Sequence, residues 1–379
     1  MKKVWSAFAL LCAAAMLARA ERLDFGACYA EWSGGRLKVG NAHFERAWVA
    51  GIKGLTPVSF ALKNPDTELL SGAVRQTKPA STLAAKVVSA RRSAVGAEGL
   101  RVEVTAGQPA RQWVLWVFPA ASGVLTEPAH GERAAATSAV EDASGIEIDL
   151  RQCEKKQAEQ EVLGAETLAL SPQHLRAVQV ALMDQTDNHN ELVWEREWLL
   201  MPNEATFNVQ GCVLIVENAL DGSGIVFLKL APLPHARHDR DAADFSVHAG
   251  RRTISAFFNG YPVAVLVYRG GRAGCTRALQ AFQRCLREFQ PSRDGLFLSN
   301  TWGDRSRDAR INEAFLLKEV EAGAALGVDV VQIDDGWQKG RSANSVAARG
   351  KGVWNGYWAA DPNFWEPDPA RFPGGLDRV

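Results

Sequence analysis

Residues 328–338 read Val-Asp-Val-Val-Gln-Ile-Asp-Asp-Gly-Trp-Gln, and this stretch indicates most clearly how the C-terminal part of the chain is expected to fold. An apolar run, typical of a buried strand, leads into two adjacent acids, Asp334 and Asp335, and then Trp337. Each carboxylate can accept hydrogen bonds from sugar hydroxyls, and an indole offers a flat apolar face to a sugar ring. An isolated Asp-Asp-Gly triplet also suits a solvated turn. Its position directly after a buried-type strand favours a sugar site.

The residues before this stretch predict a parallel α/β arrangement. A strand is expected at 296–300, leading into Trp302, and a helix from about 308 to 326. The apolar face of that helix is expected to carry Ala314, Leu317, Val320 and Ala324. Gly327 ends the helix, and the second strand follows at 328–333. Functional groups gather at the carboxyl ends of such strands, where Trp302 and the acid pair both lie.

The long N-terminal region predicts a different architecture. From residue 21 to 270, short β-rich runs such as 113–118 and 225–230 are separated by Gly, Pro, Asn and Asp. This pattern predicts a large antiparallel β-sandwich. A helix follows at about 276–289, within a connecting segment 271–295, and its apolar face is expected to carry Leu279, Phe282, Leu286 and Phe289.

Composition excludes some classes of partner. Lys plus Arg and Asp plus Glu both number 43, so no basic excess favours nucleic acid or an anionic membrane surface. A neutral partner such as a glycan is compatible with this balance. Residues 235–241 concentrate His, Arg and Asp, but no second cluster lies at a metal-site spacing, so a solvated loop without metal is expected there. No cofactor is expected either.

The N-terminus and the cysteines indicate an exported protein. Residues 1–20 read as a signal peptide, because Lys2 and Lys3 precede an apolar stretch that ends in an Ala-Arg-Ala cleavage site. A secreted or periplasmic location is therefore expected. The remaining cysteines are sparse and odd in number, which predicts no disulfide framework. Cys275 and Cys285 would lie about 15 Å apart along a helix, too far for a bridge.

Three segments together resemble a known family. Residues 299–303 read SNTWG, residues 332–338 read QIDDGWQ, and residues 368–376 read DPARFPGGL. In order and spacing they resemble the first part of α-galactosidases of glycoside hydrolase family 36, also described as melibiase-like. The resemblance covers residues 296–379. It implies a multidomain enzyme in which an N-terminal all-β sandwich precedes a (β/α)8 TIM barrel, of which residues 296–379 would be the incomplete first part.

The resemblance also implies a reaction and roles for individual residues. Family members hydrolyse terminal α-galactosides with retention, using two aspartates that follow the fourth and sixth barrel strands. Residues 296–379 are far fewer than the ~250 of a complete barrel, so both aspartates are expected beyond Val379. The chain is thus expected to be an inactive N-terminal fragment. Trp302, Asp334, Asp335 and Trp337 would bind the substrate, an α-galactoside oligosaccharide or glycan.

Alternatives remain open at this point. Both tryptophans could instead pack in the core at the barrel mouth. The aromatic stretch 354–365 could line outer sugar subsites or pack on itself. Glu366 and Asp368 flank Pro367, and structural roles are favoured for both. The chain as a whole could be a carbohydrate-binding protein without catalysis, or part of a galactosyltransferase similar to raffinose synthases.

Overall fold

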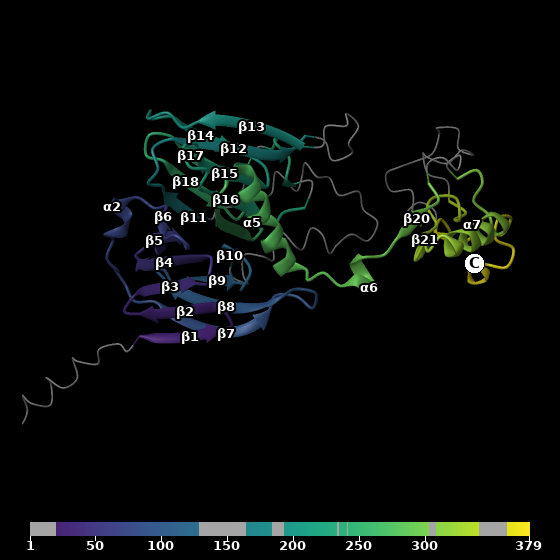
Figure 1. Cartoon of the computed structure of the whole chain (residues 1–379), viewed down its shortest axis with the longest axis horizontal. Coiled ribbons are helices and arrows are strands. Elements are labelled where there is room, and N and C mark those ends of the chain that lie inside the picture. Colours follow the sequence, from purple (N-terminus) through teal and green to yellow (C-terminus); the bar gives the residue numbers. More distant parts are fainter. Residues whose placement is uncertain are drawn as a thin grey trace, which may run out of the picture. The chain divides into compact units, whose positions relative to one another are not determined.

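The computed structural model describes residues 20–128, 164–183, 193–232, 235–240, 242–302, 308–340 and 362–379. It divides the chain into two units, labelled by element in Figure 1. The described residues up to Glu288 form an N-terminal unit, and those from Phe289 onward form a C-terminal unit. Almost all of the expected signal peptide lies outside the described residues.

The N-terminal unit is built from antiparallel β-sheets, as the sequence predicts. The first sheet is a meander of six strands that pair in chain order. Its strands are β1 (Glu21–Phe25), β2 (Cys28–Ser33), β3 (Arg36–Gly40), β4 (Phe44–Gly51), β5 (Gly54–Leu62) and β6 (Thr67–Glu68). A short helix, α2 (Gly72–Arg75), follows the last strand of this sheet.

The second sheet has nine strands in the order β13-β12-β15-β16-β19-β10-β9-β8-β7, all antiparallel. Pairing of β10 with β19 brings distant parts of the chain together at the middle of the sheet. The strands are β7 (Ala84–Arg91), β8 (Glu98–Ala106), β9 (Arg111–Val117), β10 (Gly123–Pro128), β12 (Leu175–Leu182), β13 (Val193–Leu199), β15 (Val213–Asn218), β16 (Gly224–Lys229) and β19 (Val263–Tyr268).

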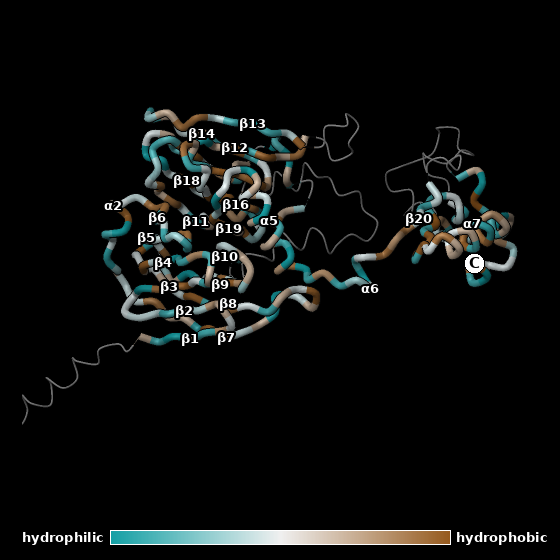
Figure 2. The backbone as a smooth tube through the Cα atoms, viewed as in Figure 1, coloured by the Kyte–Doolittle hydropathy of each residue, from teal (hydrophilic) through white to brown (hydrophobic). Residues whose placement is uncertain are grey.

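A third antiparallel sheet of four strands completes the sandwich. Its order is β11 (Gly164–Ala169), β18 (Thr253–Phe257), β17 (Phe245–His248) and β14 (Thr206–Val209). One hydrophobic cluster joins all three sheets and includes Phe60, Phe227 and Phe245, none of which has exposed surface. Figure 2 shows that the apolar segments concentrate in the strands rather than in the turns.

The strands β16 and β19 are buried at every position because both faces of the sheet are covered at its centre. Ile225 and Phe227 point into the cluster between the sheets, whereas Val226 and Leu228 pack in a second cluster with a helix. A continuous apolar run is therefore expected here in place of strict alternation. The alternating pattern returns in β12, which has one covered face.

The covering helix is α5 (Gly271–Leu286), and it differs from the expected connecting helix in two ways. It starts at Gly271 rather than near residue 276, and it packs on the sheet through Gly274, Cys275, Ala278, Phe282 and Cys285. Phe282 meets Phe118 edge to face, with ring centroids 6.4 Å apart. Phe289 lies beyond the helix and is exposed. Cys275 and Cys285 are both free thiols, as their predicted separation requires.

The C-terminal unit contains a parallel strand pair joined by a helix. Strands β20 (Leu298–Asn300) and β21 (Val330–Gln332) pair in parallel, and α7 (Glu313–Ala325) lies between them in the chain. Short turns of helix occur at α6 (Pro291–Asp294) and η3 (Leu376–Arg378). The strand–helix–strand order matches the prediction, although both strands and the helix are shorter than expected.

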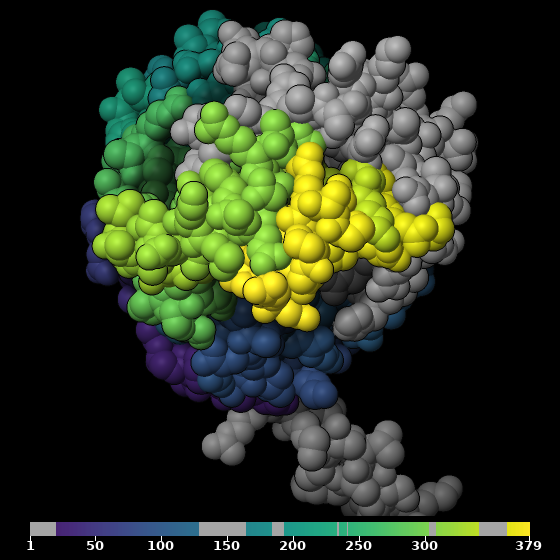
Figure 3. Space-filling model, turned by 90° about the vertical axis from the view of Figure 1, so that its right-hand side faces the viewer, coloured from purple at the N-terminus to yellow at the C-terminus, as the bar shows by residue number. Residues whose placement is uncertain are grey.

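The face that α7 buries is not the expected one. Leu316 and Gly323 are buried, whereas Ala314, Leu317 and Ala324 are exposed. Leu316 packs with Ile311 and Phe372, and Gly323 lies against Val328 and Val331. The segment that contributes Phe372 therefore determines which face of α7 is buried. In Figure 3 this segment lies beside α7 on the surface. No helix in the described part of the chain is long and apolar enough to cross a membrane.

Candidate functional site

The acid pair and Trp302 follow two strands whose carboxyl ends lie at the same edge. Asn300 stands opposite Gln332 in the parallel register, and the Thr301 amide donates to the carbonyl of Gln332 at 3.0 Å. Parallel strands present their carboxyl ends together, so the segments that follow them are neighbours. Trp302 and Asp334 thus both continue from one edge of the strand pair.

Hydrogen bonds of the Asn300 and Thr301 side chains tie these two strand ends to each other. The Asn300 Nδ2 donates to Asp334 Oδ2 at 3.0 Å, while the Asn300 Oδ1 accepts from the Trp302 amide at 2.7 Å. In return, the Asp334 amide donates to the buried Thr301 Oγ1 at 3.0 Å. One amide side chain therefore orients both the Asp334 carboxylate and the backbone of Trp302.

The acid pair itself forms a tight turn. The Asp335 amide donates to Asp334 Oδ1 at 2.8 Å, and Gln338 Nε2 donates to Asp335 Oδ1 at 3.2 Å. Gly336 has φ +112°, and a Cβ there would lie 2.7 Å from the Cβ of Asp308, so only glycine fits. Asp334 is half-buried, and each carboxylate oxygen can accept two hydrogen bonds. Asp334 therefore keeps acceptor capacity for a ligand.

The two tryptophans have different surroundings. Trp302 is half-buried and is held through its backbone amide. Trp337 packs against the small core around Ile311 and stacks on Trp365, with ring centroids 6.1 Å apart and planes 25° apart. Trp337 therefore packs in the core, which is the alternative to a sugar-binding role that its sequence left open. Most of the aromatic stretch 354–365 lies outside the described residues.

The segment 362–379 forms hydrogen bonds with the backbone of the turn that contains the acid pair. Arg371 Nη1 donates to the carbonyls of Asp308 at 2.5 Å and Gly336 at 2.8 Å. The amide of Asp368 donates to the Trp337 carbonyl at 2.8 Å. The Asp368 carboxylate caps the next turn by accepting from the Ala370 amide at 2.9 Å, which gives this acid a structural role. Glu366 pairs with Lys339 at 2.5 Å on the surface.

Sequence reasoning did not single out Asn300, Thr301, Gln338 or Arg371. A signal was present, because the first two belong to the SNTWG segment and the others to QIDDGWQ and DPARF. The roles of Asn300, Thr301 and Arg371 depend on pairing between segments more than 30 residues apart, as in the bond from Asn300 to Asp334. Local patterns carry no information about such pairing.

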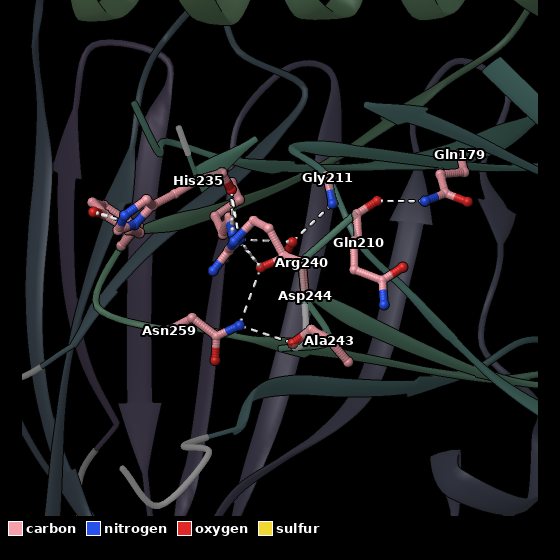
Figure 4. Close-up of polar contacts among 10 residues, drawn as sticks. Gln179, Gln210, Gly211, His235, Arg240, Ala243, Asp244 and Asn259 are labelled. Carbon is pink, nitrogen blue, oxygen red and sulfur yellow. Dashed lines mark hydrogen bonds and ion pairs between the residues drawn. The ribbon is translucent and has the colours of Figure 1, made fainter. Parts of the chain in front are cut away.

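The segment 235–241, expected as a solvated loop, is described at residues 235–240 and is partly buried there, since Ala236 and Arg240 are buried while Asp239 is exposed. Arg240 is 4% exposed, and its Nη1 lies 3.3 Å from both oxygens of Asp244, which has no exposed surface. Lys229 also donates to Asp244. Figure 4 shows Gly211, Arg240 and Asn259 converging on Asp244, with hydrogen bonds of 2.8 Å from Gly211 N and 3.1 Å from Asn259 Nδ2. The expectation of a solvated loop was wrong because Arg240, a cation of this segment, pairs with the buried Asp244 carboxylate.

This Asp244 network has the properties of a structural element. Burial lowers the pKa of the Lys229 ammonium, and Asp244 opposes that effect. Burial, aided by Arg240 and Lys229, lowers the pKa of His235 to about 4, so its imidazole is neutral at pH 7. No group of side chains suited to holding a metal ion occurs in the described ranges. Two cations on one carboxylate lock the loop to β16 and β17.

Comparison with known proteins gives a likeness in structure alone. No family model matches the sequence, and no curated protein matches it. An α-galactosidase from Lactobacillus brevis aligns with 90% of this chain at a TM-score of 0.50 and 10% identity. The family 36 α-galactosidase AgaA from Geobacillus stearothermophilus aligns with 90% at a TM-score of 0.52 and 10% identity. A variant of AgaA in complex with 1-deoxygalactonojirimycin gives a TM-score of 0.51 at the same identity and coverage.

These matches support the fold of family 36 for this chain. The chain spans about half the length of each matched structure, 52% of the Lactobacillus protein and 54% of AgaA. At 10% identity the likeness concerns the arrangement of the backbone. It is consistent with an N-terminal β-sandwich.

Proposed function

We propose that this chain contributes the β-sandwich and part of the sugar-binding wall of an exported glycoside hydrolase that acts on terminal α-galactosides. The observation that carries the proposal is the pairing of two strand ends, in which Asn300 joins Asp334 to the backbone of Trp302. The fold likeness to α-galactosidases supports the glycosidase relationship. The proposal takes β20, α7 and β21 as the opening of a (β/α)8 barrel.

In the proposed site, Asp334 and Asp335 accept hydrogen bonds from galactosyl hydroxyls. A carboxylate suits this task because charge-assisted hydrogen bonds are stronger than neutral ones. The bond from Asn300 Nδ2 orients the Asp334 carboxylate, which reduces the freedom lost on binding. Trp302 is proposed to face the apolar side of the sugar. Trp337, which stacks on Trp365, is proposed to contribute through the shape of the wall.

The proposed reaction follows the retaining course. A carboxylate displaces the leaving group at the anomeric carbon, and water then hydrolyses the glycosyl intermediate with help from an acid/base carboxyl. Within this proposal the residues of the present chain bind and orient the sugar. The nucleophile and the acid/base are those that the family resemblance puts after Val379. The proposed export relies on the signal-like residues 1–20.

The test is to express the complete open reading frame of the gene and to measure hydrolysis of nitrophenyl α-galactoside, β-galactoside and α-glucoside. We expect turnover of the α-galactoside alone. Asp334→Asn should lower kcat/KM by about 10–100-fold, because it removes the charge from hydrogen bonds worth roughly 1.5–3 kcal/mol. Asp377→Asn is the matched control, since Asp377 is an exposed acid in η3 and not one of the residues proposed to bind the sugar.

Two results would refute the proposal. Hydrolysis of a different glycoside, with no action on the α-galactoside, would exclude the substrate class. An Asp334→Asn enzyme with the kinetics of the Asp377→Asn control would exclude a role for Asp334 in binding. A folded protein that binds galactosides without turnover would instead support the carbohydrate-binding alternative.

A further inference from the structure

A second candidate site lies in the N-terminal unit, where its three sheets meet. A cavity of about 310 Å³ is lined by residues of β4 and β5 from the first sheet, β9 and β10 from the second, and β11 from the third. Its volume is at the lower end of the ~300–1,000 Å³ range of small-molecule sites. Space for one sugar residue therefore exists at this junction.

Two indoles form apolar walls of the cavity. Trp48 is buried, and Trp113 is half-buried. Gly54 has φ +124°, and a Cβ at this position would lie 2.4 Å from Cη2 of Trp113. The absence of a side chain at Gly54 is thus what lets the Trp113 indole lie against the hairpin between β4 and β5. Indole faces of this kind suit the C–H face of a sugar ring.

A buried acid also lines the cavity. The side chain of Glu166 is 5% exposed and forms an ion pair with Arg46, which has no exposed surface. The Arg46 guanidinium lies over the rings of Trp48 and Phe60, 4.8 Å and 4.4 Å from their centroids. Trp48 Nε1 donates to Glu166 Oε1 at 3.3 Å, whereas Oε2 has no hydrogen-bond partner among the described residues. Oε2 is closed off from solvent, so Glu166 and Arg46 form a charge-compensated pair within the wall of the cavity.

Two cations line the same cavity at its exposed side. Lys53 lies in the turn between β4 and β5, and Arg111 begins β9. Both residues are exposed, and within the described ranges neither side chain forms a hydrogen bond or an ion pair. The cavity thus combines the half-buried Trp113 indole in its wall with unpaired positive charge facing solvent.

We propose that this cavity binds a sugar residue that carries a carboxylate, such as a hexuronic acid of an acidic glycan. The apolar face of the sugar ring would lie against the Trp113 indole, while Lys53 and Arg111 would hold the carboxylate by charge-assisted hydrogen bonds. A nucleobase or a bare phosphate matches only one of these features. The proposal is independent of the strand-end site at Asp334, because every residue involved belongs to the sandwich.

The test measures binding of digalacturonate to the whole chain by titration calorimetry and by tryptophan fluorescence. We expect one saturable site with a Kd of about 1 mM or lower. The double variant Lys53→Glu/Arg111→Glu should weaken binding at least about tenfold, since it reverses both charges that face the carboxylate. Arg251→Glu is the control, because Arg251 is an exposed cation on the turn between β17 and β18 and does not line the cavity.

Neutral galactobiose and inorganic phosphate distinguish the features of the ligand. We expect both to bind at least about tenfold more weakly than digalacturonate, since each lacks one of the two recognised features. The proposal is overturned if digalacturonate shows no saturation up to about 10 mM, or if phosphate binds equally well. Equal loss of affinity in the Arg251→Glu control would also overturn it, because the effect would then reflect overall charge. Substitution of exposed cations leaves the buried core intact, so these variants are expected to fold.

Discussion

The two units of this chain differ most in how completely they cover their own apolar surface. In the sandwich, β16 and β19 are buried at all six positions, and one cluster joins three sheets. In the C-terminal unit, β20 and β21 have no fully buried residue, and the apolar cluster among the described residues has three buried members, Ile311, Leu316 and Phe372, with Phe364 buried outside it. The sandwich therefore has the core of an independent domain, whereas the described strand pair does not.

The residues that stabilise the fold and the residues of the proposed sugar site thus lie mainly in different units. Exposed apolar residues in the C-terminal unit include Phe297 and Leu298, which precede or lie within a strand. The same unit carries Trp302 and the acid pair, so the proposed chemistry is concentrated where the described packing is sparse. The sandwich holds its own polar groups in paired networks such as the one around Asp244.

The largest expected effect tests that comparison with one truncation in each unit. Phe227→Ala removes a ring without exposed surface that packs near Phe245, and should lower the free energy of unfolding of the sandwich by about 3–5 kcal/mol. Leu298→Ala removes a side chain that is 48% exposed and should cost less than about 1 kcal/mol. Chemical denaturation followed by tryptophan fluorescence measures both. Similar losses in the free energy of unfolding for the two variants would contradict the difference in apolar packing between the units.

A somewhat smaller effect is expected from the buried charge network. Asp244→Asn leaves Lys229 and Arg240 buried without their shared counter-charge and should lower the free energy of unfolding by about 3 kcal/mol. The double variant Asp244→Asn/Lys229→Met should recover part of that loss, because it removes one uncompensated charge. Thermal unfolding of the single and double variants supplies the measurement. A double variant less stable than Asp244→Asn would show that Lys229 is needed for packing rather than for charge balance.

Much of the fold could be predicted because it depends on local pattern. Period-two alternation and turn residues revealed the antiparallel sandwich, and the strand–helix–strand order of the C-terminal unit followed from periodicity. The errors occur where a distant segment decides burial. Leu316 faces inward because Phe372 packs against it, and α5 packs on the sheet because β16 and β19 have a second apolar face to cover.

The candidate site shows the same limit. Trp302 and the acid pair were predicted as a sugar site from residue type and position after a strand, and that role stays a prediction. The residues that orient them were not, since Asn300 acts through a bond to Asp334 and Arg371 through carbonyls of two separate segments. The burial of Arg240 was also missed, because it depends on the Asp244 carboxylate, which accepts from Arg240, and on Lys229, which donates to the His235 carbonyl.

The smallest expected effect concerns pH and is located in the sandwich. Burial holds the pKa of His235 at about 4, against an ordinary value of 6.5, while its Nδ1 lies 2.7 Å from the Tyr261 hydroxyl. Between these two pKa values the unfolded chain binds a proton that the folded chain does not, so this group's stabilising contribution is complete above pH 6.5 and declines as pH falls toward 4. Because His235 is only partly buried, we expect a loss of about 1 kcal/mol between pH 6.5 and 5 that His235→Gln removes. Denaturant unfolding at both pH values provides the comparison, and an unchanged pH dependence in His235→Gln would assign the effect to other groups.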